Sequence, residues 1–136
     1  MIEKSKRLPI ALLALRIGVF IVFFMWALDK LINPEHAASI FERYYKISGL
    51  ASSVPYIIGG VQMLLLLAFI LGIWKKWTYG VIFVLHLFST LSTIPQLLNP
   101  WKAPNLLFYA SIPMLAAIFA LWLLRDEDTM FTIGKN

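Results

Sequence analysis

The chain has 136 residues, of which 60% are hydrophobic and 14% are charged, and its formal net charge is +5. A soluble domain of this composition would expose large apolar patches, so the composition argues against that class and favours a membrane protein. The basic residues stand at the ends of apolar runs, where they indicate topology, and no basic stripe with interleaved aromatic residues suggests nucleic-acid binding. Because the chain has no cysteine, it cannot itself form disulfides or carry out thiol redox chemistry.

The first apolar run, residues 8–32, organises the predicted fold. A helix rises ~1.5 Å per residue and needs ~20 apolar residues to cross ~30 Å of hydrocarbon, so this run predicts an uncleaved transmembrane helix. Arg16 lies well inside it. A charge at bilayer depth costs about 2.5–3.5 kcal/mol, so we expect the guanidinium to face the bundle interior and to have a partner there. The alternative interpretation is that it snorkels to the headgroups.

The remaining elements follow in order along the chain. Residues 34–47 have an apolar and a polar face, which predicts an amphipathic helix lying on the membrane surface. Three further transmembrane helices are predicted at about 54–74, 77–98 and 104–124, and Pro113 is expected to kink the last one or rearrange its hydrogen bonds. The tail, residues 125–136, is polar and is expected to be mobile and cytoplasmic.

Together these elements predict one integral membrane domain, residues 1–136, of the all-α class. It would be a four-helix transmembrane bundle with one short amphipathic surface helix between helices one and two. Four crossings place both termini on one side, and the basic residues that flank the crossings favour the cytoplasmic side of the inner membrane. Asn-Pro pairs at 33–34 and 99–100 leave a two-helix repeat open beside ordinary helix termination.

Polar residues within the apolar runs are the candidates for a functional site. His86 begins a polar stripe on one face of the third transmembrane helix, and counting from the two helix starts places it at the depth of Arg16. These two would form the inner end of a polar core. The predicted ligand-binding residues are Arg16, Asp29, Lys30, Gln62, His86, Thr93 and Gln96. The alternative is that such groups only join helices through hydrogen bonds worth about 0.6 kcal/mol each.

No catalytic signature appears in the sequence. There is no arrangement of nucleophile and base, and no paired carboxylates lie within a span, so the chain is not expected to be catalytic alone. His36 and His86 should be separated by most of the membrane, so a shared metal is not expected.

Several motifs resemble those of the DoxX-like family of small membrane proteins. They are Arg16 early in the first helix, Leu28-Asp29-Lys30-Leu31 with Asn33-Pro34, an aromatic segment that follows, and residues 86–97. The resemblance implies four helices and membership of a quinone-linked oxidoreductase complex as a membrane subunit, with a quinone as the candidate cofactor. The wider superfamily reaches into membrane chaperones and methylamine-utilisation accessory proteins.

Three functional hypotheses follow. The first is an accessory membrane subunit that holds a small amphiphile, such as a quinone or a lipid, in its polar core; its partners would be the bilayer and a membrane or redox protein. The second is a structural, interaction or chaperone-like protein without a ligand. The third is a small-molecule transporter, which would need a homo-oligomer or a repeat to form its pathway.

Overall fold

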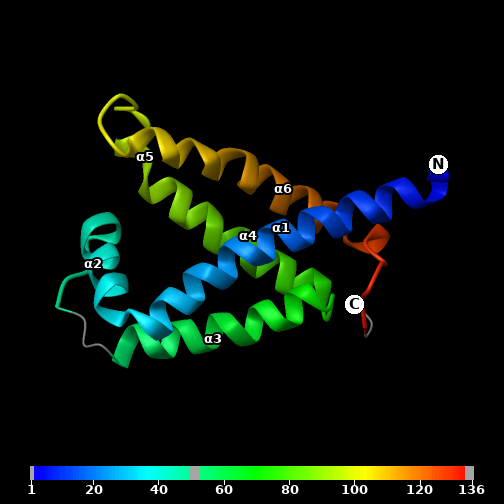
Figure 1. Cartoon of the computed structure of the whole chain (residues 1–136), viewed down its shortest axis with the longest axis horizontal. Coiled ribbons are helices and arrows are strands. Elements are labelled where there is room, and N and C mark those ends of the chain that lie inside the picture. The colour runs from blue at the N-terminus through cyan, green and yellow to red at the C-terminus, as the bar shows by residue number, and fades with distance from the viewer. Residues whose placement is uncertain (1, 50–52, 134–136) are drawn as a thin grey trace.

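The computed structural model describes residues 2–49 and 53–133, and most of these residues are helical (Figure 1). No strand occurs among them, which confirms the all-α class. The α-helices are α1 (Lys4–Ile32), α2 (Pro34–Tyr45), α3 (Ser53–Ile70), α4 (Lys75–Ser92), α5 (Ile94–Leu97) and α6 (Ser111–Leu123), and the 3-10 helices are η1 (Asn105–Ala110) and η2 (Arg125–Glu127).

Three segments of the described chain are long and apolar enough to cross a membrane. They are α1, α3 and the continuous run of η1 and α6, Asn105–Leu123. The predicted crossing at 77–98 is not among them, because the two lysines that begin α4 and His86 in its second half lower its mean hydropathy. The membrane class is therefore confirmed, and the count of four transmembrane helices is not.

Prolines divide the two helices that were predicted to be continuous. α4 ends at Ser92 and the short α5 begins at Ile94, because Pro95 has no N–H for the helical ladder and its ring clashes with the preceding turn. The segment 104–124 begins as the 3-10 helix η1 and becomes α-helical at Ser111, two residues before Pro113. The rearrangement expected near Pro113 thus takes the form of a change of helix type.

The turn between α3 and α4 packs against the C-terminal segment. α3 ends at Ile70 rather than at 74, and Gly72 follows with φ of +68°, a left-handed conformation that glycine adopts without strain. A Cβ at Gly72 would lie 2.5 Å from the Thr132 side chain, and the Ile133 N–H donates to the Leu71 carbonyl over 2.8 Å. Thr132 and Ile133 of the tail that was predicted to be mobile therefore pack against this turn, and residues 134–136 of that tail lie outside the described part of the chain.

The distribution of polarity is that of a protein in lipid. The buried side chains include four that ionise, Arg16, Lys75, His86 and Asp128. The outer face of α4, by contrast, is apolar: Trp77, Val84 and Phe88 are 68%, 61% and 62% exposed. An outward face of this kind would be an aggregation hazard in water and suits contact with acyl chains.

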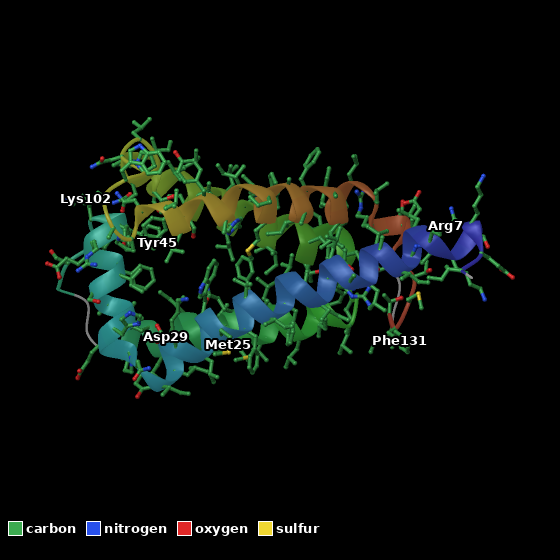
Figure 2. All side chains as sticks on the ribbon, turned by 45° about the horizontal axis from the view of Figure 1, so that its top comes forward. Arg7, Met25, Asp29, Tyr45, Lys102 and Phe131 are labelled. Atoms are coloured by element: carbon green, nitrogen blue, oxygen red, sulfur yellow. The ribbon has the colours of Figure 1, made fainter. Side chains whose placement is uncertain are left out.

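Two helix pairs diverge from one end of the molecule. α1 packs along α3, α4 packs along α6, and α1 also contacts α6. The pairs lie close together near the N- and C-terminal ends and separate toward α2 (Figure 1). Figure 2 places Asp29, Tyr45 and Lys102 at the α2 end and Arg7 and Phe131 at the opposite end. We refer to these as the outer end and the inner end.

Candidate functional site

A cavity of about 910 Å³ lies between the diverging pairs, beneath α2. Residues of α1, α2, α3, α4, η1 and α6 line it, and most of the lining is aliphatic or aromatic. The polar side chains on its wall come mainly from one strip of α4 and the last turn of α1, with Gln62 of α3, two tyrosines of α2 and Ser111 of α6. A mostly apolar cavity of this size with a small number of polar groups is the usual form of a site for a small molecule.

His86 is the most buried polar group on the cavity wall. Its side chain is 1% exposed, and its Nε2 lies 2.9 Å from the Ser111 carbonyl oxygen. A carbonyl can only accept, so Nε2 carries the proton. Trp26 stacks on the imidazole at 6.1 Å between ring centroids, and the edge of Phe23 meets it at 5.9 Å. Contacts from α1 and α6 therefore fix the orientation of this ring, and Nδ1 is buried with no partner among the described residues.

Thr90 repeats the pattern one helical turn later. It is 8% exposed, lines the same cavity, and its Oγ1 is also buried without a partner in the described chain. Residues four apart on a helix share a face, so His86 and Thr90 present their free polar atoms on the same side of α4. An unpaired buried polar atom costs free energy, and two on one cavity wall require an explanation.

α2 covers the outer end of the cavity through aromatic contacts. The Tyr45 hydroxyl lies 2.8 Å from the Ser89 hydroxyl of α4, and the Tyr45 ring stacks on Phe88 at 5.5 Å. Tyr44 meets Phe108 of η1 edge-on at 5.5 Å. The amphipathic segment predicted at 34–47 is thus a helix that bridges the two sides of the cavity with its aromatic face.

Five of the seven predicted site residues line this cavity: Asp29, Lys30, Gln62, His86 and Thr93. Asp29 Oδ2 lies 2.7 Å from His36 Nδ1, so this carboxylate already has a partner. The Thr93 hydroxyl donates to the Thr90 carbonyl over 2.8 Å, which is ordinary helix-end bonding. No group of three or more metal-ligating side chains occurs in residues 2–49 and 53–133.

Gln96 belongs to a second cavity at the outer end. This cavity measures about 450 Å³ and is bordered by Arg43 and Lys102 as well as by Asn99 and Asn105. The Oε1 atom of Gln96 is buried there without a partner in the described residues. Gln96 therefore does not join His86, because α5 turns away after the break at Thr93.

Arg16 is also separate from the cavity. It is 0% exposed, and its Nη1 donates to Asp128 Oδ1 over 2.7 Å, while its Nη2 donates to the Met130 carbonyl. Tyr79 donates its hydroxyl to the other oxygen of Asp128, and Lys75 Nζ donates to the Asp128 backbone carbonyl. Arg16, Lys75, Tyr79 and Asp128 form the inner-end cluster.

The expected meeting of Arg16 and His86 is wrong. His86 contacts Phe23 and Trp26, which lie seven and ten positions after Arg16, or ~10–15 Å further along α1. The estimate that the two residues lie at the same depth was made by counting residues from the start of each helix. It is wrong because α1 begins at Lys4 and its first turns project beyond the other helices (Figure 1).

Sequence reasoning missed Asp128 and Tyr79 at the inner end and Ser111 and Trp26 beside His86. The requirement of a buried arginine for a carboxylate was a usable signal, since an acidic run stands at 126–128 near the same end. The sequence offered no such signal for Ser111, because it accepts the hydrogen bond through its backbone carbonyl, which every residue has.

The chain was compared with known proteins. No curated protein and no solved structure matches it significantly. A family model described as "Methylamine utilisation protein MauE" matches residues 8–102, which is more than half of the chain and extends from α1 past α5. The assignment to the DoxX-like family is therefore corrected, and that family's quinone-linked complex no longer applies. The chain, an integral membrane protein with three apolar spans in its described part, belongs to the MauE family of methylamine utilisation proteins.

Proposed function

We propose that the chain is an accessory membrane protein that binds a small amphiphile in the cavity beneath α2. The carrying observation is the pair of unpartnered buried atoms, His86 Nδ1 and Thr90 Oγ1, on the wall of an otherwise apolar space. A purely structural role would favour filling that space or pairing those atoms, because voids and unpaired polar groups both reduce stability. The family's description, "Methylamine utilisation protein MauE", suggests that this role serves methylamine utilisation.

We also propose that α4 is a fourth crossing. The N-terminal end and the end of the described chain lie at the same end of the molecule, which supports an even number of crossings (Figure 1). α4 runs between the inner and outer ends with an apolar outer face, and its Thr78, His86 and Thr90 are buried. With the basic flanks of the inner end, this arrangement favours cytoplasmic termini.

A cavity-filling variant tests the binding proposal. Gly18 lines the cavity, and a Cβ there would meet nothing within 4 Å, so the side chain of Gly18→Leu starts in open space on the cavity wall. Gly60→Leu is the matched control: it is also a helical glycine with open space at its Cβ, and it does not line the cavity. We expect an amphiphile in organic extracts of the purified wild-type and Gly60→Leu proteins, measured by mass spectrometry, and its loss from Gly18→Leu.

The proposal is wrong if all three extracts contain the same lipids in the same ratio to protein. Thermal unfolding in detergent provides the check on folding, since both variants should melt near the wild type without ligand.

A further inference from the structure

The proposed binding site has a chemical preference that follows from the proton on His86. Its Nε2 donates to the Ser111 carbonyl, and the neutral imidazole has only one N–H. Nδ1 is therefore a lone-pair acceptor. The stacked Trp26 ring and the edge of Phe23 prevent the imidazole from turning over to exchange its two nitrogens.

The surroundings of Nδ1 supply no donor. No described side chain bonds to it, and the hydroxyl of Thr90, one helical turn along α4 on the same cavity wall, is itself unpartnered. The charged residues on the wall, Asp29 and Lys30, are at the last turn of α1, where Asp29 is held by His36 and Lys30 Nζ lies 3.4 Å from the Trp26 carbonyl. A buried acceptor beside a hydroxyl, which can give or take a hydrogen bond, is complementary to an O–H group.

We propose that the cavity selects amphiphiles whose headgroup carries a hydroxyl, which donates to His86 Nδ1 and contacts Thr90 Oγ1, with the apolar part along Val22, Met114 and Ala117. This inference rests on the binding role proposed above and specifies the ligand class. A reduced quinone and a lipid alcohol both carry such a group. A ligand that offers only a carbonyl or an ether oxygen would place an acceptor against an acceptor.

A matched pair of probes isolates the hydroxyl. 4-Nonylphenol and its methyl ether have the same ring and chain, and only the phenol can donate. Binding to the purified wild-type protein is measured by quenching of tryptophan fluorescence, with Trp26→Phe identifying the signal from the indole that stacks on His86. We expect the phenol to bind about five- to ten-fold more tightly than the ether, the equivalent of one hydrogen bond.

Two variants connect the preference to the named atoms. His86→Phe keeps an aromatic ring beside Trp26 and Phe23 but has no acceptor, so the preference for the phenol should disappear. Thr90→Val, which keeps the side-chain shape, should reduce the preference in part. Val84→Ala, a change on the outer face of the same helix, should leave it unchanged.

The outcomes separate this inference from the binding role. Equal affinity for phenol and ether would overturn the hydroxyl preference and leave amphiphile binding intact. Binding of neither probe, nor of decylubiquinol or dioctanoylglycerol, would overturn both, with ordered water as the partner of Nδ1. If the probes show the preference, the relative affinities of decylubiquinol and dioctanoylglycerol distinguish a quinol from a lipid alcohol as the source.

Discussion

The two ends of the bundle both bury polar side chains, but they treat them differently. At the inner end both oxygens of the Asp128 carboxylate are paired, one with Arg16 and the other with Tyr79, and of the Arg16 guanidinium only Nε has no partner among the described residues. At the outer end His86 and Thr90 face a cavity with atoms that no described residue pairs. We therefore expect the ion pair at the inner end to stabilise the fold and the unpaired atoms at the outer end to bind a ligand.

The largest effect should come from breaking the pair at the inner end. Arg16→Ala or Asp128→Ala leaves an uncompensated buried charge, and we expect a loss of about 3–5 kcal/mol in the free energy of unfolding. Thermal unfolding in detergent measures it, with Arg7→Ala, an exposed basic residue of the same helix, as the control.

The double variant Arg16→Met/Asp128→Leu sharpens this test. Removing both charges together should recover much of the loss, because apolar pairs of similar volume replace buried ion pairs at little cost. If Arg16→Ala and Asp128→Ala unfold at the same temperature as Arg7→Ala, the inner-end cluster does not stabilise the fold and the contrast between the two ends is wrong.

An intermediate effect is expected from Tyr79→Phe. The change deletes one buried hydrogen bond to a charged acceptor and keeps the ring that packs on Phe69 at 5.0 Å. We expect a loss of about 1.5–3 kcal/mol, measured by the same unfolding experiment. Phe69 and the ring packing are untouched, so a loss as large as that of Arg16→Ala would mean that the whole cluster rearranges.

The smallest effect should come from the helix that covers the cavity. Tyr45→Phe removes the hydroxyl contact with Ser89 and keeps the stacking on Phe88, so we expect a loss of about 0.5–1.5 kcal/mol. Tyr44→Phe is the control, because the Tyr44 hydroxyl has no hydrogen bond among the described residues and its ring contact with Phe108 is retained.

Hydrogen exchange of the α2 amides tests whether Tyr45 holds this helix over the cavity. Tyr45→Phe should increase the exchange of α2 amides and leave α1 and α4 unchanged. Equal exchange in the two tyrosine variants would show that the bridge from Tyr45 to Ser89 does not hold α2 over the cavity.

The sequence was sufficient for class, order and approximate position of the elements. Long apolar runs and an amphipathic stretch are local patterns, so α1, α2 and α3 could be placed from residue spacing. Burial of Arg16 and His86 also followed, because an ionisable group in lipid must face inward.

Partners could not be predicted in the same way. The contact between Arg16 and Asp128 joins residues 112 positions apart, and the depth of each helix depends on how far α1 projects beyond its neighbours. Neither quantity has a periodic signature. The division of the helices at Thr93 and Ser111 could be predicted only in part. A proline in the sequence indicates that a helix is interrupted nearby, but it does not indicate at which residue the backbone changes.

The pairing of Arg16 with Asp128 has a consequence for biogenesis. Translation delivers the arginine in the first helix and its carboxylate 112 residues later, after the three apolar spans of the described residues have been made. A nascent chain therefore holds the Arg16 guanidinium without its carboxylate partner until residue 128 has been made. Chains that stop before Asp128 would contain the three apolar spans of the described chain and still lack the partner of Arg16, which gives quality-control proteases a way to distinguish them.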